Sequence, residues 1–139
     1  EVSAVDTALL ALLAGDPALR VHDGFVPVDE AVKVISVPLP YVVFFSSDDD
    51  ESDTRFSGRV GSGAITFQIT YVGDSREQAK RAGLRARNRL SRRRVTVAGK
   101  ESSLIHLDDS MLVRRDDDFT RPGGGPLFYG VDRYSVGGI

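Results

Sequence analysis

The stretch from Ala64 to Val72 constrains the fold most, because polar and apolar residues alternate there without a break. Such alternation predicts a half-solvated antiparallel strand. Gly73 and Asp74 interrupt the pattern, and Ser75 fits the N-cap of a helix that runs from Arg76 to about Arg93. The apolar face of the strand carries Ile65, Phe67, Ile69 and Tyr71.

The apolar side of this helix is a narrow stripe of small residues. A spacing of 100° per residue places these side chains on one face, and their small size allows the helix backbone to lie close against a sheet. The stripe consists of Ala79, Ala82, Gly83, Ala86 and Leu90.

Three other parts of the chain carry recognisable patterns. Apolar residues recur at helical spacing from Val2 to Leu13, and Gly15, Asp16 and Pro17 end that helix. The run Tyr41 to Phe45 is too short for a helix and predicts a central strand buried on both faces. Further strand pieces are expected at 95–97, 104–107, 111–113 and 127–136, with Asp108-Asp109 as a break between the second and third.

The order helix, strands, helix, strands predicts an α+β fold, a mainly antiparallel sheet with two helices packed on one face. The 139 residues, 41% of them hydrophobic, are enough for one domain over 1–139. An acidic loop is expected at about 46–58 and a Gly-rich loop at about 120–126. No apolar run approaches the length of about 18 residues that spans a bilayer, so no membrane partner is expected.

The charges are segregated along the chain. Half of the 18 basic residues fall between Arg76 and Arg94, whereas acidic residues cluster in the 48–53 loop and at 116–118. The net charge is only −2, so the chain as a whole does not have the composition of a polyanion binder. Opposite charges on one chain favour a heterologous contact, in which neighbouring copies pair these regions and close into a ring.

The motifs that could carry chemistry are incomplete. In a calcium loop counted from Asp48, the required Gly and Glu positions hold Asp53 and Arg59. The glycines at 61–63 and 123–125 lack the strand and helix context of a nucleophile elbow or a phosphate cradle.

His22 and His106 fit structural roles, and Asp116-Asp117-Asp118 predicts a charged turn. The sequence therefore predicts no enzyme, no cofactor and no metal, although a pocket converging on either histidine would favour a small enzyme.

The basic helix leaves two further interpretations open. Its Arg and Lys residues could bind phosphates through counterion release, which makes the helix at 76–94 a candidate nucleic-acid-binding surface. The sequence has neither the aromatic signature of a single-strand RNA sheet nor a preceding helix-turn-helix partner. The helix face could also be solvated and have no partner.

The order of segments resembles the tail terminator, or tail completion, proteins of long-tailed bacteriophages. The resemblance is carried by the opening helix, the Leu39-Pro40-Tyr41-Val42-Val43 strand, the alternating strand and the Ser75-Arg76-Glu77-Gln78-Ala79 helix start. It continues into strands near 105–113 and 128–136 and covers most of the chain. None of these segments encodes chemistry.

The resemblance implies a virion structural protein at the head–tail junction, assembled in the host cytoplasm. Its hexameric ring would cap the tail tube, stop polymerisation of the major tail tube protein and join the head-side connector, while DNA passes through the lumen without specific binding. Another neck ring protein, a stopper or head–tail adaptor, is the nearest alternative. As contacts between subunits or with tail and neck proteins, we predict Arg81, Arg85 and Arg92 against Asp48, Asp49, Asp50 and Glu51.

Overall fold

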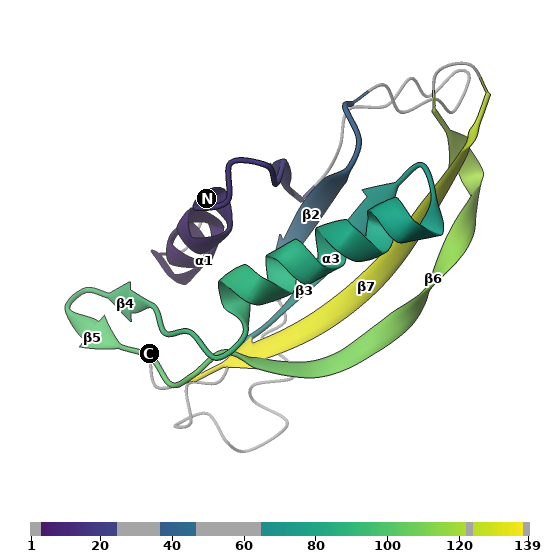
Figure 1. The fold of residues 1–139 in the computed structure, drawn as a ribbon. Coiled ribbons are helices and arrows are strands. Elements are labelled where there is room, and N and C mark those ends of the chain that lie inside the picture. The colour runs from purple at the N-terminus through teal and green to yellow at the C-terminus, as the bar shows by residue number, and fades with distance from the viewer. Residues whose placement is uncertain (1–3, 25–36, 47–64, 122–123, 138–139) are drawn as a thin grey trace.

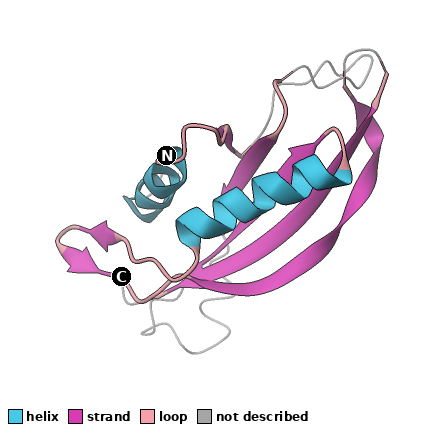
Figure 2. Ribbon diagram, viewed as in Figure 1, coloured by secondary structure: helices cyan, strands magenta, loops and turns pink. Residues whose placement is uncertain are grey.

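The computed structural model describes residues 4–24, 37–46, 65–121 and 124–137 (Figure 1). Two helices lie over one face of a long, twisted sheet (Figure 2). The α+β class and the mainly antiparallel sheet predicted from the sequence are therefore confirmed. The elements are α1 (Ala4–Ala14), β1 (Val21–Asp23), β2 (Tyr41–Ser46), β3 (Ile65–Gly73), α3 (Arg76–Leu90), β4 (Thr96–Val97), β5 (Lys100–Glu101), β6 (His106–Thr120) and β7 (Pro126–Val136).

The main sheet has the strand order β1-β2-β3-β7-β6. All of its neighbouring strands are antiparallel except β1 and β2, which are parallel. The middle strand is β3, which pairs along its whole length with β7. The expectation that β2 would be the central strand is thus wrong in position, although β2 is an interior strand whose residues Tyr41 to Phe44 are buried on both faces.

The core lies between the helices and the sheet. On β3, the predicted alternation is confirmed, because Phe67, Ile69 and Tyr71 are buried toward the helices while Thr66 is exposed. A smaller apolar cluster on the other face of the sheet includes Val43 and Val72. From the helices, the main core receives Val5, Leu9, Leu13, Ala79, Ala82, Ala86 and Leu90.

Helix α3 begins with the cap that the sequence predicts. The Ser75 hydroxyl oxygen accepts a hydrogen bond from the Gln78 N–H, and the Gln78 side-chain oxygen accepts one from the Asp74 N–H. These bonds satisfy donors at the helix start that have no partner within the helix. The predicted small-residue stripe is also confirmed, because its five members are the buried residues of α3.

The small stripe allows α3 to approach Tyr71 on β3. A Cβ atom at Gly83 of α3 would lie 2.9 Å from the Tyr71 ring, and one at Gly130 of β7 would lie 2.5 Å from it. The tyrosine ring therefore occupies space that side chains at either glycine would need. This close contact explains why the buried residues on this face of α3 are small.

The last third of the chain differs from the sequence expectation. The structure has one 15-residue strand, β6, where the sequence predicted two pieces separated by Asp108-Asp109 and then a turn at 116–118. The strand passes both acidic sites by shifts of register against β7, including one between Leu107 and Asp109 and one between Asp116 and Thr120. Irregular pairing of this kind lets an edge strand accommodate exposed charges without ending.

The end of α3 and the start of β4 also differ from the boundaries that the sequence predicted. Helix α3 ends at Leu90 rather than near Arg93, because Ser91 is extended and Arg92 takes a left-handed conformation with φ 63°. The Arg92 N–H then donates to the Ile105 carbonyl, so a tertiary hydrogen bond replaces the next helical one. The piece predicted at 95–97 forms β4, which pairs with β5 in a separate two-stranded sheet.

Several sequence predictions fall outside the described residues. They include the acidic loop beyond Ser46, with Asp48, Asp49, Asp50 and Glu51, and the glycines at 61–63. In the Gly-rich region, Thr120 ends β6 and Pro126 begins β7, and the described loop residues between them are Arg121, Gly124 and Gly125.

Candidate functional site

The basic stretch predicted as a contact surface is divided by the fold. Of its three candidate arginines, Arg81 and Arg85 lie on α3, whereas Arg92 follows the end of the helix. All three are exposed. They do not form one continuous helical face, because Arg92 belongs to the turn that leads to β4.

Arg85 already has a partner within the chain. Its guanidinium group lies 3.1 Å from the Asp16 carboxylate, just beyond the end of α1. The pKa of Asp16 is lowered, chiefly by a hydrogen bond from the Ala18 N–H and further by Arg85, against an opposing effect of desolvation. Because 52% of the Arg85 side chain is exposed, this ion pair is accessible to solvent and contributes little to stability.

Arg81 and Arg92 have no such partner. Within the described part of the chain, no carboxylate lies within salt-bridge distance of either side chain. No described carboxylate therefore neutralises their positive charge. The carboxylates predicted to meet them, Asp48 to Glu51, lie outside the described residues, so the structure does not test that pairing.

Two other arginines of α3 bind inside the molecule, and the sequence argument missed both contacts. Arg89 donates a hydrogen bond of 2.8 Å from Nε to the Leu12 carbonyl oxygen in the last turn of α1. That carbonyl also accepts a 3.2 Å hydrogen bond from the Gly15 N–H just past the helix, and a cation near a helix C-terminus is favourable. Arg89 therefore holds α1 against α3.

The second missed contact is a buried polar cluster around Asp132 of β7. This carboxylate is 0% exposed and lies 3.1 Å from the Arg87 guanidinium. The Ser110 hydroxyl donates to its other oxygen at 2.7 Å, and the Tyr134 hydroxyl lies at 3.4 Å. Burial, and then the Asp132 charge, raise the pKa of Tyr134. The sequence contains a signal for this buried cluster. Asp132 is the one charged residue on the inward-facing side of β7, which is otherwise apolar or aromatic.

Among the exposed acidic residues that the structure describes, Asp108, Asp109, Asp117 and Asp118 lie along β6, at the edge of the sheet, whereas Asp23, Asp74, Glu77 and Glu101 are exposed elsewhere. Asp108 accepts hydrogen bonds from the Ser135 hydroxyl at 3.1 Å and contacts His106 Nδ1 at 2.8 Å. Asp109 and Asp117 are exposed without a cation at salt-bridge distance among the described residues. Within the described chain, β6 pairs on one side only, with β7, so its other side is an open edge.

The two histidines lie in different surroundings. The His22 ring packs edge-on against Tyr41, with ring centroids 5.4 Å apart. His106 is exposed and contacts Asp108, while Ser135 donates to Asp108 rather than to the imidazole. This trio consequently lacks the serine–imidazole hydrogen bond of a nucleophilic triad. Nowhere in the described ranges do three or more His, Asp or Glu side chains gather as a metal site, and neither described helix is long and apolar enough to cross a membrane.

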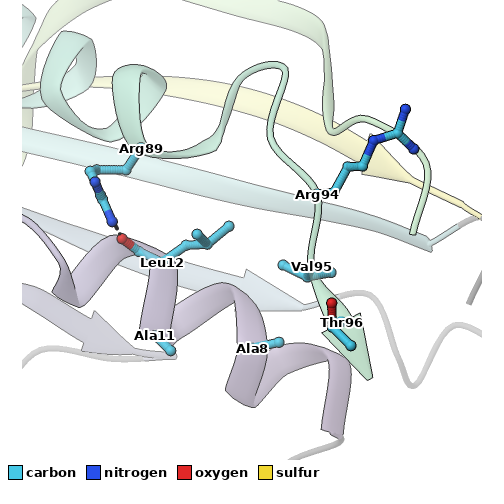
Figure 3. Close-up of a pocket in the computed structure, with 7 residues that line it drawn as sticks. All are labelled: Ala8, Ala11, Leu12, Arg89, Arg94, Val95 and Thr96. Carbon is cyan, nitrogen blue, oxygen red and sulfur yellow. Dashed lines mark hydrogen bonds between the residues drawn. The ribbon is translucent and has the colours of Figure 1, made fainter. Parts of the chain in front are cut away.

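A shallow hollow lies between α1, the end of α3 and β4 (Figure 3). In the close-up, Arg89 reaches toward Leu12, whereas Arg94 extends away from α1. The hollow has a volume of about 370 Å³ and a mostly apolar lining, with Arg89 at one side. It is lined by Ala8, Ala11, Leu12, Arg89, Arg94, Val95 and Thr96.

Comparisons with protein-family models, with curated proteins and with solved structures give no match for this chain. Its function is therefore inferred from its own surfaces. Those surfaces are an interrupted basic array on α3 and the following turn, and an acidic open edge on β6.

Proposed function

We propose that this protein is a tail terminator of a long-tailed bacteriophage, a structural subunit whose hexameric ring caps the tail tube. In this role it stops polymerisation of the major tail tube protein and presents its other side to the head–tail connector. The work of such a subunit is selective binding. DNA passes through the lumen of its ring without specific contacts.

The observation that carries the proposal is the separation of unpaired charge in the structure. Arg81 and Arg92 have no carboxylate partner among the described residues, and Asp109 and Asp117 on β6 have no cation partner there. In the figure, α3 lies over the middle of the sheet while β6 follows its outer edge (Figure 1). A contact between different surfaces of neighbouring copies pairs such charges, and it closes into a ring when the rotation between copies allows it.

The proposed contact depends on charge for its register and on apolar contact for its strength. Exposed ion pairs contribute about 0–1 kcal/mol each, so several of them select the partner and its orientation without supplying high affinity. Arg81 and Arg92 are the strongest candidates, and Arg85 contributes while it remains bound to Asp16. The loop residues Asp48 to Glu51 are the proposed acceptors on a neighbour or on the tube.

Native mass spectrometry at near-physiological salt tests the proposal. We expect a species at six times the subunit mass of 15.1 kDa. The double variant Arg81→Glu, Arg92→Glu should reduce that species strongly, because it places negative charge opposite the acidic partner. The matched control Arg81→Lys, Arg92→Lys keeps both charges and should retain the ring. A ring of another stoichiometry that binds connector rather than tube protein would favour the stopper or adaptor.

A nucleic-acid-binding domain is the alternative from a different class. It is favoured by the three consecutive arginines Arg92 to Arg94, since none of them has a carboxylate partner within the described residues. This alternative predicts that purified protein retains DNA or RNA, that added salt releases it steeply, and that Arg85→Glu with Arg92→Glu abolishes retention. A monomer that retains nucleic acid in this way would contradict the tail terminator proposal.

A further inference from the structure

The hollow between α1 and β4 combines an apolar floor with positive charge. Ala8, Leu12 and Val95 contribute apolar surface, and Ala8 and Leu12 also pack against the main core, which holds the floor in place. At about 370 Å³ the hollow is larger than a cavity of about 150 Å³ that accommodates benzene in another protein. It has room for a branched aliphatic side chain.

The two arginines that line the hollow have no carboxylate partner among the described residues. Arg89 is bound to the Leu12 carbonyl oxygen, and Arg94 is bound to the Ser102 carbonyl oxygen at 2.9 Å. The nearby Asp16 carboxylate is bound by Arg85. In the described part of the chain, no acidic side chain forms a salt bridge with Arg89 or Arg94. An apolar side chain preceded by a carboxylate would match this surface.

The chain carries such a feature on β6. Leu112 is 86% exposed, the most exposed of the large hydrophobic residues that the structure describes. The register between β6 and β7 explains its position. Met111 pairs with Val131 and Arg114 with Tyr129, so Leu112 and Val113 together face the single residue Gly130.

This bulge separates the two side chains. Val113 packs against the main core, whereas Leu112 projects into solvent. Three residues before Leu112, Asp109 supplies an exposed carboxylate with no cation at salt-bridge distance among the described residues. The pattern of a carboxylate followed by an exposed leucine matches the rim and floor of the hollow.

We propose that Leu112 of one copy inserts into the hollow formed by α1 and β4 of the next copy, with Asp109 directed toward Arg89. The two surfaces lie on different sides of the molecule, since α1 packs near β1 at one end of the strand order and β6 is at the other (Figure 1). The contact is therefore head to tail, and repetition of it gives a ring or an open chain. This inference rests on the proposed ring-forming function and names its subunit contact.

The orientation of β6 is fixed by its own charges. Arg114 and Arg115 follow Leu112 just as Asp109 precedes it. The reverse orientation would bring these arginines against Arg89, and like charges in close contact disfavour association. The acidic side of Leu112 therefore faces Arg89.

Cysteine cross-linking tests the contact. The natural chain has no cysteine, so no other disulfide can form in the variants. One variant carries Leu112→Cys and a second carries Ala11→Cys, both at exposed positions. Each variant alone should stay uncross-linked under mild oxidation, and a mixture should yield dimers joining positions 112 and 11. A single chain with both substitutions should give a covalent ladder up to the ring size. Leu84→Cys, at another exposed leucine, mixed with Ala11→Cys is the control and should not cross-link.

Leu112→Ser gives an independent measurement. Loss of a leucine that is buried in the proposed contact should weaken association by about 10- to 100-fold per contact. Leu84→Ser should leave association unchanged. Six-subunit rings without a link between positions 11 and 112 would overturn this inference and leave the proposed function intact. Protein that stays monomeric, and forms no such link at concentrations on the order of 1 mM, would overturn both.

Discussion

The arginines between positions 81 and 92 fall into two groups that differ in what they contact. Arg87 and Arg89 point into the molecule and bind Asp132 and the end of α1, whereas Arg81 and Arg92 remain exposed without a carboxylate partner among the described residues. Arg85 is intermediate, since it forms a half-exposed pair with Asp16. A uniform run of basic residues thus contains one group that holds the fold together and another that is available to partners. Mutations at the two groups should have separable effects.

The largest expected effect is at the inward group. Asp132→Ala should lower the free energy of unfolding by about 3 kcal/mol, because it removes the only carboxylate bound to Arg87 in the described structure and leaves a partly buried guanidinium without its partner. Urea unfolding followed by circular dichroism measures this change. Asp132→Asn is the matched control, since it keeps an acceptor for Ser110 and should cost less. Equal, small losses for both variants would mean that the cluster does not stabilise the fold.

An alkaline pH should weaken the same inward cluster. Burial and the Asp132 charge raise the pKa of Tyr134 above its ordinary value of 10. Above pH 10 the unfolded chain releases the tyrosine proton while the folded chain retains it, so stability falls as pH rises. The slope should approach about 1.4 kcal/mol per pH unit for this tyrosine.

The variant Tyr134→Phe measures that contribution. It removes the ionisable hydroxyl together with its long, 3.4 Å hydrogen bond to Asp132 and its interaction with Arg87. Its loss of stability between pH 10 and 11 should be shallower than that of the natural protein in thermal or urea unfolding. Parallel pH profiles for the two proteins would contradict the assignment of this pKa shift.

The smallest effect compares the two groups directly. Arg89→Ala should destabilise the protein by about 1–2 kcal/mol, because it removes a charged donor from the Leu12 carbonyl at the end of α1. Arg81→Ala should change the free energy of unfolding by less than about 0.5 kcal/mol, as is usual for exposed positions without a partner. Thermal unfolding measures both. A loss at Arg81 as large as that at Arg89 would erase the distinction between inward and outward arginines.

Local periodicity predicted the parts of the fold that have a regular pattern. The alternation in β3, the buried stripe of α3 and the Ser75 cap each depend on residues close together in sequence, and all are confirmed. Patterns at the sheet edge were misleading. The paired aspartates Asp108 and Asp109 were predicted to separate two strands. Instead they lie in the single edge strand β6, which exposes them to solvent and continues past them through shifts of register against β7.

The candidate site was less accessible to sequence reasoning. Arg85 was identified as exposed and basic, but its partner Asp16 is 69 residues away and follows a different helix. Arg92 was placed on the helical face, yet a hydrogen bond to Ile105 ends the local pattern before it. The tail terminator role and the contact with Asp48 to Glu51 remain predictions.

The sequence by itself determined the regularly patterned segments, α1, β2, β3 and α3, and their apolar faces, because these properties follow from side-chain order over a few residues. Only the tertiary structure decided which charged groups are bound inside and which remain outside. Arg87 and Asp132 are 45 residues apart in sequence, and only the packing of α3 across β7 brings them within 3.1 Å. The same packing leaves Arg81 in solvent, so the division of one basic run into two roles is a property of the folded chain.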